Sequence, residues 1–235
     1  MDCRWQLGHP EAGRELYLAG HIPGASFLDV ETDLSAPPGG AEGGRHPLPR
    51  PDDFARAARA AGIGADTLVV AYDQGMNGGA ARLWWLLRHF GHNDVAVLRG
   101  GLDDWLGPLR AGEEHIEPAE LVLRPREDDV VSAEEIQERL GTPNFLLVDA
   151  RAAERYRGEV EPIDPVAGHI PGAVNMPYTD EPLSVDPDSE VAVYCGSGIT
   201  AAVTVLALER AGVEAKLYPG SWSEWSSRGL EVERG

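Results

Sequence analysis

The chain has 235 residues, of which 43% are hydrophobic and 25% are charged, a composition typical of a globular protein long enough for one large domain or two ordinary ones. Its 20 basic and 39 acidic residues give a net charge of −19, which would repel a phosphate backbone and excludes nucleic acid as an expected partner. The sequence contains no run of 18 apolar residues, so neither a transmembrane helix nor a membrane partner is predicted.

The start of the chain, MDCRWQLGHPEAGREL, has neither the apolar stretch of a signal peptide nor the basic character of a transit peptide. The expected compartment is therefore the cytoplasm. Two cysteines, Cys3 and Cys195, are too few for a disulfide framework or a structural zinc site, and His89, His92 and Cys3 do not have the spacing of metal ligands. No metal site and no cofactor are expected.

Short apolar runs alternate with helical patterns along the chain. Buried strands are predicted over 68–72, 95–98, 145–148, 191–194 and 215–218. Helices are predicted over 54–61, 80–90, 133–140 and 201–211. Ser132 and Glu135 form a capping box before the third helix, and Gly141 and Gly212 suit the left-handed residue that ends a helix. This alternation predicts α/β domains with parallel sheets that are flanked by helices on both faces.

One string of seven residues, AGHIPGA, occurs twice, at 19–25 and 167–173. Two further pairs follow in the same order in each half: LVVAYD and VAVYC, then LRGGLDDW and LYPGSWSEW. The repeated order indicates a tandem duplication of domains of about 100 residues. The two strings are 148 residues apart, but Asp73 and Cys195, which end the next pair, are 122 apart. The first copy therefore carries 26 extra residues, mostly the Pro- and Gly-rich segment 29–51, which is predicted to be an ordered or lid-like loop.

Between the halves lies the polar segment 107–129, which contains three prolines and is predicted to be the linker. It would separate an N-terminal domain over 1–106 from a C-terminal domain over 130–235. Each domain is expected to be a parallel sheet flanked by helices.

The motif that carries chemistry is VAVYCGSGIT, in which Cys195 follows a predicted strand and precedes a predicted helix. In a parallel sheet, ligands bind beyond the carboxyl ends of the strands, where this cysteine lies. Glycines remove the Cβ atoms that would block a tight loop with inward N–H groups. The N–H groups expected to stabilise an anion belong to Gly196, Gly198, Ile199 and Thr200. Ser197 and Thr200 add hydroxyl donors, and Thr200 suits the N-cap of the helix.

Such a ring of N–H donors is expected to favour the thiolate, the nucleophilic form of Cys195. The alternative is that Cys195 is an ordinary buried apolar residue, the common position of a lone cysteine. The Gly-Ser-Gly run that follows it serves no packing purpose and favours the nucleophile. The equivalent loop of the first half has Asp73 at this position, so only the C-terminal domain is predicted to be catalytic.

The two GHIPGA strings, DARAAERYRG at 149–158, YCGSGIT and YPGSWSEW together resemble the tandem-domain rhodaneses, the thiosulfate or 3-mercaptopyruvate sulfurtransferases. The resemblance covers nearly the whole chain, although the first strand of the N-terminal domain looks absent or short. It implies that Cys195 takes a sulfane sulfur from a small anionic donor, holds it as a persulfide, and passes it to a thiol or cyanide. The N-terminal domain would be the non-catalytic copy.

The resemblance also implies roles for other side chains. Arg155 matches the family arginine that binds the anionic donor, and Asp149 would brace the cysteine loop. His21 matches a histidine suggested to assist catalysis. Two of these residues have an alternative interpretation. Arg155 would then be a solvated charge, and His21 would stabilise its turn, because His169 occupies the same string in the other half.

The choice of donor stays open. The sequence CGSGIT lacks basic residues after the cysteine and resembles the mercaptopyruvate-type enzymes, in which Ser197 would help to polarise the substrate. These enzymes usually have a second arginine after Glu-Pro, however, and this chain has Ile163 there. One arm of the expected carboxylate clamp is therefore missing.

Two other functions are weighed against sulfur transfer. Dual-specificity phosphatases that share the single-domain fold need Cys-x5-Arg, and the residue six places after Cys195 is Ala201. A non-catalytic regulatory or sulfur-carrier-binding module would be expected to lose the cysteine, which is present here.

Overall fold

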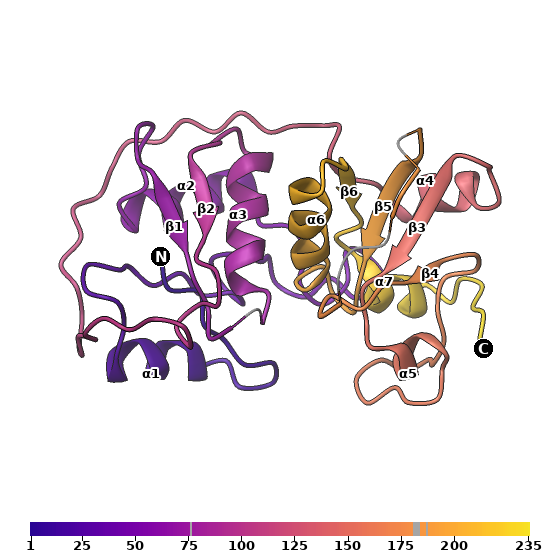
Figure 1. The fold of residues 1–235 in the computed structure, drawn as a ribbon, viewed down its shortest axis with the longest axis horizontal. Coiled ribbons are helices and arrows are strands. Elements are labelled where there is room, and N and C mark those ends of the chain that lie inside the picture. Colours follow the sequence, from indigo (N-terminus) through magenta and orange to yellow (C-terminus); the bar gives the residue numbers. More distant parts are fainter. Residues whose placement is uncertain (76, 181–183, 187) are drawn as a thin grey trace. The chain divides into compact units, whose positions relative to one another are not determined.

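The structure is a computed structural model that describes residues 1–75, 77–180, 184–186 and 188–235 (Figure 1). The chain forms two compact units, each made of two segments. Unit 1 comprises Met1–Ala36 and Leu48–Arg126, and unit 2 comprises Pro37–Pro47 and Glu127–Gly235. The units therefore differ from the predicted domains in two ways. Part of the insertion of the first half belongs to unit 2, and most of the predicted linker belongs to unit 1.

Unit 2 contains a parallel sheet with the strand order β4-β3-β5-β6. Its strands are β3 (Phe145–Asp149), β4 (Val174–Asn175), β5 (Glu190–Tyr194) and β6 (Ala215–Leu217). Its helices are α4 (Ala133–Arg139), α5 (Ala153–Tyr156), α6 (Ala201–Arg210) and α7 (Ser221–Ser227). In the register of the central pair, Asp149 lies opposite Tyr194, so β3 and β5 end at the same edge of the sheet. This edge places the segment after Asp149 beside the loop that starts at Cys195.

The two faces of this sheet are covered by different helices. Helices α4 and α7 pack with the face that carries Leu147, Ala192 and Tyr194, and they contribute Ile136 and Trp222, all buried. Helix α6 lies against β5 and β6 on the other side (Figure 1). Burial of an Ile or Leu side chain stabilises a fold by about 1.5–3 kcal/mol, so this core holds the end of β5 firmly. The prediction of a parallel sheet between helices is confirmed for unit 2.

Unit 1 has a smaller parallel sheet. Its elements are α1 (Ala12–Ala19), α2 (Pro51–Ala60), β1 (Val69–Ala71), α3 (Gly79–His89) and β2 (Val95–Val97). Asp2 forms isolated parallel bridges with Phe27 and Tyr72. Its position corresponds to that of Asp149 in β3 of unit 2, which pairs with a strand on each side. The prediction of buried strands is wrong for β1, because Val70 is 43% exposed, and for β2, because Ala96 is exposed and neither Val95 nor Val97 is buried.

The predicted linker is held along unit 1 by backbone hydrogen bonds. Arg110 forms an antiparallel bridge with His21, and the N–H of Arg124 donates to the carbonyl of Phe90 at 2.8 Å. No helix or strand is formed over 107–129, but its backbone groups still find partners in unit 1. The segment is therefore an ordered strap and not a free tether.

The other predicted elements agree with the structure to within a few residues. The capping box is confirmed: the N–H of Glu135 donates to Ser132 Oγ, and the N–H of Ser132 donates to Glu135 Oε2. Gly141 and Gly212 adopt φ values of 78° and 83°, as expected for residues that end a helix. Among the described residues, none of the helices is long and apolar enough to cross a membrane.

Candidate active site

Cys195 follows β5 directly and is buried. Its backbone N–H donates to Ser221 Oγ at 3.1 Å, and that hydroxyl donates in turn to the carbonyl of Tyr218 at 2.9 Å. Ser221 has a φ of 53°, a strained value for a residue with a side chain, and this strain accompanies its bridging position. The Sγ of Cys195 accepts a hydrogen bond from the N–H of Gly198 at 3.1 Å. A donor aimed at the sulfur stabilises a negative charge there.

Glycine occupies the two positions of the loop for different physical reasons. Gly198 has a φ of 80°, and a Cβ on it would lie 2.5 Å from the carbonyl oxygen of Pro219, so the backbone requires glycine. Gly196 lies under two guanidinium groups, described below. Ile199 is buried, and Thr200 occupies the N-cap position of α6 as predicted, although its side chain makes no capping hydrogen bond.

A buried ion pair follows the end of β3. Arg151 donates from Nη2 to Asp149 Oδ2 at 2.6 Å and from Nε to Asp149 Oδ1 at 3.0 Å, and both side chains are almost fully buried. Burial alone would lower the pKa of Arg151, but the Asp149 carboxylate raises it above its ordinary value. Nη1 of Arg151 reaches Glu161 at 3.3 Å. Asp149 thus supports the site by fixing Arg151, which contacts the next carboxylate.

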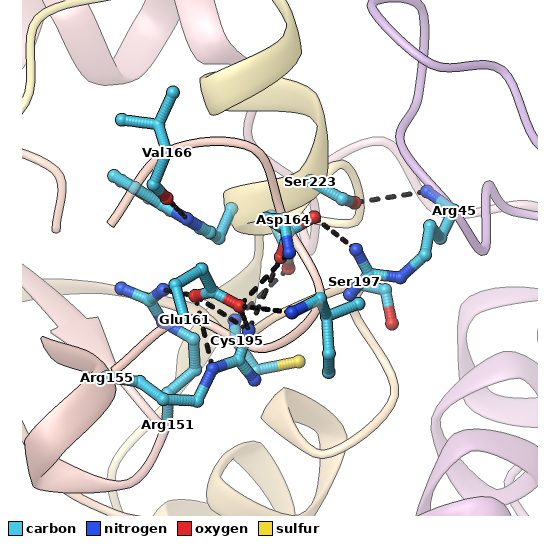
Figure 2. A network of polar contacts seen from close by, with 12 residues as sticks. Arg45, Arg151, Arg155, Glu161, Asp164, Val166, Cys195, Ser197 and Ser223 are labelled. Atoms are coloured by element: carbon cyan, nitrogen blue, oxygen red, sulfur yellow. Dashed lines mark hydrogen bonds and ion pairs between the residues drawn. The ribbon is translucent and has the colours of Figure 1, made fainter. Parts of the chain in front are cut away.

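Arg155 belongs to a network of side chains beside the cysteine loop (Figure 2). It donates from Nη2 to Glu161 Oε1 at 2.7 Å and to Asp164 Oδ2 at 3.3 Å. Burial would raise the pKa of Glu161, but hydrogen bonds from Arg155 and from the backbone N–H groups of Asp164 and Ile163 lower it. Arg155 is therefore a positioned guanidinium and not a solvated charge, as a donor-binding residue should be.

The segment Pro37–Pro47 adds a second arginine to this network. Arg45 forms an ion pair between Nη1 and Asp164 Oδ1, and its backbone N–H donates to Ser223 Oγ at 3.0 Å. Gly44 has a φ of 75°, and a Cβ on it would lie 2.4 Å from Ser223 Oγ. The glycine thus lets the segment lie directly against α7.

The same segment brings a histidine to the loop. His46 Nδ1 lies 2.7 Å from Ser197 Oγ, and both residues are buried. Sequence analysis missed Arg45 and His46, because they lie in the predicted 29–51 loop, far from the cysteine motif. The string GRHPLP could have indicated these two residues, because it places an Arg-His pair inside an otherwise Pro- and Gly-rich insertion.

His21 lies in unit 1, fully buried. Its Nδ1 is 2.9 Å from the carbonyl oxygen of Tyr17, its ring stacks on the Tyr17 ring with centroids 4.1 Å apart, and its Nε2 is 3.3 Å from Glu114. His169 repeats this arrangement on Tyr156, with Nδ1 2.8 Å from the carbonyl oxygen and ring centroids 3.8 Å apart. The matching geometry favours the turn-stabilising alternative for His21.

Asp73 occupies the position in unit 1 that Cys195 has in unit 2. Its carboxylate accepts hydrogen bonds from the backbone N–H groups of Gly75, Gly78 and Ala80 at 3.1–3.2 Å. The loop thus retains its anion-binding form around a fixed carboxylate, which cannot act as a thiol nucleophile. Within the described ranges, no group of three or more His, Cys, Asp or Glu side chains is placed to hold a metal ion.

The chain is similar to known proteins over nearly its whole length. The rhodanese-like domain model matches residues 1–107 and 132–228. A Pseudomonas aeruginosa protein named as a 3-mercaptopyruvate sulfurtransferase is 44% identical over 250 residues, which cover 96% of this chain and 88% of the relative. A Mycobacterium tuberculosis protein named as a thiosulfate sulfurtransferase is 39% identical over 97% of this chain and 87% of the relative. The crystal structure of SseA from Escherichia coli, a 3-mercaptopyruvate sulfotransferase, has a TM-score of 0.81 and 35% identity, covering 94% of this chain and 91% of that one.

Proposed function

The chain belongs to the tandem-domain rhodanese family of sulfurtransferases, and on that premise we propose that Cys195 carries the sulfur during transfer. The reaction moves a sulfane sulfur from thiosulfate or 3-mercaptopyruvate to a thiophilic acceptor, a thiol or cyanide. The observation that carries the assignment is the hydrogen bond from the Gly198 N–H to the Sγ of Cys195, in a loop at the carboxyl end of β5.

The chemistry divides into two displacements. The Cys195 thiolate attacks the outer sulfur of thiosulfate, or the thiol sulfur of mercaptopyruvate, whose proton is lost from the resulting persulfide. The S–S bond of thiosulfate or the C–S bond of mercaptopyruvate breaks. Its electron pair leaves with pyruvate enolate, which takes up a proton, or with sulfite. The anionic persulfide then transfers its outer sulfur to the acceptor thiolate or cyanide, and the Cys195 thiolate is regenerated.

Each neighbouring group has a distinct part in this proposal. The loop N–H groups stabilise the charge on the outer persulfide sulfur, and Arg155 binds the anionic end of the donor. Ser197 polarises the donor carbonyl, and His46 acts as a positioning residue because it fixes the Ser197 hydroxyl. Asp149 supports Arg155 indirectly, through Arg151.

The assignment is tested by mass spectrometry of the intact protein after incubation with each donor. Wild type and Cys3→Ala should gain one sulfur atom, and Cys195→Ala should gain none. Cys3 is the matched control because it is also buried, and burial raises the pKa of its thiol, which disfavours the reactive thiolate. Full turnover by Cys195→Ala would rule out the persulfide mechanism.

The second candidate is a non-catalytic sulfur-carrier module. It would load Cys195 once but would not pass sulfur to cyanide or to a thiol over many turnovers. Release of pyruvate or sulfite in molar excess over protein separates the enzyme from the non-catalytic module.

The cytoplasm stays the predicted compartment.

A further inference from the structure

One carboxylate in unit 2 holds two guanidinium groups. Asp164 contacts Arg155 Nη2 through Oδ2 at 3.3 Å and pairs with Arg45 Nη1 through Oδ1. Figure 2 shows Asp164 between these side chains. The Asp164 side chain is 4% exposed, whereas those of Arg45 and Arg155 are 26% and 17% exposed. The arginines are thus held from the protein side and retain access to solvent.

The remaining amino nitrogens of the two arginines converge on one point. A Cβ built on Gly196 would lie 3.2 Å from Arg45 Nη2 and 3.4 Å from Arg155 Nη1. Gly196 adjoins Cys195 in the sequence, so this point lies beside the residue that follows the reactive cysteine. The absence of a side chain at Gly196 therefore leaves room beside two positive groups.

One more feature of Arg45 is not explained by attachment of its segment to α7. Its Nε atom is buried and has no hydrogen-bond partner among the residues that the structure describes. An unsatisfied buried donor destabilises a fold, and such atoms are rare, so a functional role of the Arg45 guanidinium is one explanation for this one. The segment already has other attachments to α7, through the Arg45 backbone N–H and through Gly44.

We propose that Arg45 is the second arm of a two-guanidinium clamp, opposite Arg155, that holds the anionic group of the sulfur donor, with Asp164 as the internal counter-charge. This inference rests on the proposed sulfurtransferase function. Arg45 would supply the second cation of the clamp, because the position after Glu-Pro where an arginine is expected has the uncharged, half-exposed Ile163.

The charges of the site agree with such a clamp. Arg151 is paired with Asp149, while Arg45 and Arg155 face Glu161 and Asp164. Burial raises the pKa of the Asp164 carboxyl despite the adjacent Arg45, so its charged form is held at a disadvantage. A donor anion can therefore share these arginines with Asp164. The overall charge of −19 repels an anion, so donor binding depends on guanidinium N–H groups at the point where the anion lies.

The test compares steady-state kinetics and Cys195 persulfide loading for wild type, Arg45→Gln, Arg45→Lys and Arg50→Gln. Arg50 is an exposed arginine that follows the segment and serves as the matched control. Arg45→Gln should raise the KM for the donor roughly 10- to 150-fold, with kcat changed much less, because a hydrogen-bonded contact to a charge is lost. Transfer from the preloaded persulfide to cyanide should keep its wild-type rate.

Arg45→Lys guards against simple loss of structure. Lysine can keep the ion pair with Asp164 but lacks the second nitrogen that turns toward Gly196, so stability should stay near wild type while KM rises about 10-fold. A wild-type KM in both Arg45 variants would overturn the clamp, even if their melting temperatures fall. Failure of wild type to load Cys195 would instead overturn the proposed function, so the two failures are distinguishable.

Discussion

The Oγ atom of Ser197 lies 2.7 Å from Nδ1 of His46, although 151 residues separate them in the sequence. The hydroxyl follows Cys195 by two positions, and the imidazole comes from the segment Pro37–Pro47, which belongs to the same compact unit. Both side chains are buried, so the direction of the hydroxyl is fixed before any donor arrives. This pair suits a donor whose leaving group needs a proton.

The two donors should therefore respond differently to loss of Ser197. Transfer from mercaptopyruvate releases an enolate that must be protonated, whereas transfer from thiosulfate releases sulfite directly. Ser197→Ala should lower kcat/KM for mercaptopyruvate about 100-fold, within the range for proton transfer by a positioned group, and should change kcat/KM for thiosulfate by less than about 5-fold. Ser226→Ala, at a buried serine whose Oγ has no partner among the described residues, is the control. Equal losses for both donors would refute this role.

The pH dependence of donor binding should depend on Asp164. Burial raises the pKa of this carboxyl above the ordinary aspartate value, so it takes up its proton at a higher pH than an exposed aspartate. Protonation removes a negative charge between Arg45 and Arg155. The KM for thiosulfate should therefore fall as the pH drops through this titration and rise again as the pH increases.

Asp164→Asn imitates the protonated state and should give a low KM that no longer changes with pH over this range. The expected difference at neutral pH is roughly 10-fold, equivalent to about 1.4 kcal/mol. Thiosulfate, a dianion, should gain more than mercaptopyruvate. KM–pH profiles for wild type, Asp164→Asn and the exposed control Asp180→Asn check this. A pH-dependent KM that persists unchanged in Asp164→Asn would assign the titration to another group.

The two halves of the chain contain equivalent buried ion pairs. Arg4 donates from Nη2 to Asp2 Oδ2 at 2.6 Å in unit 1, and Arg151 donates to Asp149 at the same distance in unit 2. Removal of one partner of a buried pair leaves an uncompensated charge and costs about 3–5 kcal/mol. Asp2→Ala and Asp149→Ala should each lower the free energy of unfolding by about this amount.

Only the unit 2 variant should also impair donor binding, because Arg151 contacts Glu161, which positions Arg155. Denaturant unfolding and donor KM, measured on the same two variants, separate stability from site geometry. If Asp149→Ala raises KM no more than Asp2→Ala does, Arg151 has no positioning role.

Local sequence patterns were sufficient to predict the part of the site that lies within one strand-loop-helix unit. An apolar strand, a glycine-rich turn and a helix specify the place of Cys195 and of the Gly198 N–H that donates to its sulfur, and the position of Asp73 follows from the repeat. Arg45 and His46 could not be placed in this way. Their positions depend on the close approach of Gly44 to α7, a tertiary contact without a periodic pattern.

Exposure of β1 was also beyond local inference. The run LVVAYD is apolar throughout, but Val70 alternates outward from its buried neighbours Val69 and Ala71. An apolar run shows that a strand is favoured, while burial of each face depends on which segments pack there.

The two glycines of the cysteine loop offer a final prediction. Gly196 does not have a positive φ, so alanine fits its backbone, but the added methyl group would lie 3.2 Å from Arg45 Nη2 and 3.4 Å from Arg155 Nη1. Gly196→Ala should therefore fold with a stability within about 0.5 kcal/mol of wild type, because the arginine ends can shift.

Its effect should appear in donor binding, because the methyl group occupies the space between the two guanidinium groups. A rise in KM of roughly 10-fold is expected, with kcat little changed. Gly198→Ala is the contrasting variant: its φ of 80° and the carbonyl of Pro219, 2.5 Å from the new Cβ, both oppose a side chain. That variant should lose about 1–3 kcal/mol of stability and most of its kcat, because the N–H donor to Cys195 moves. Thermal unfolding and steady-state kinetics of both variants check this, and a Gly196→Ala enzyme with wild-type KM would show that the donor does not enter between the arginines.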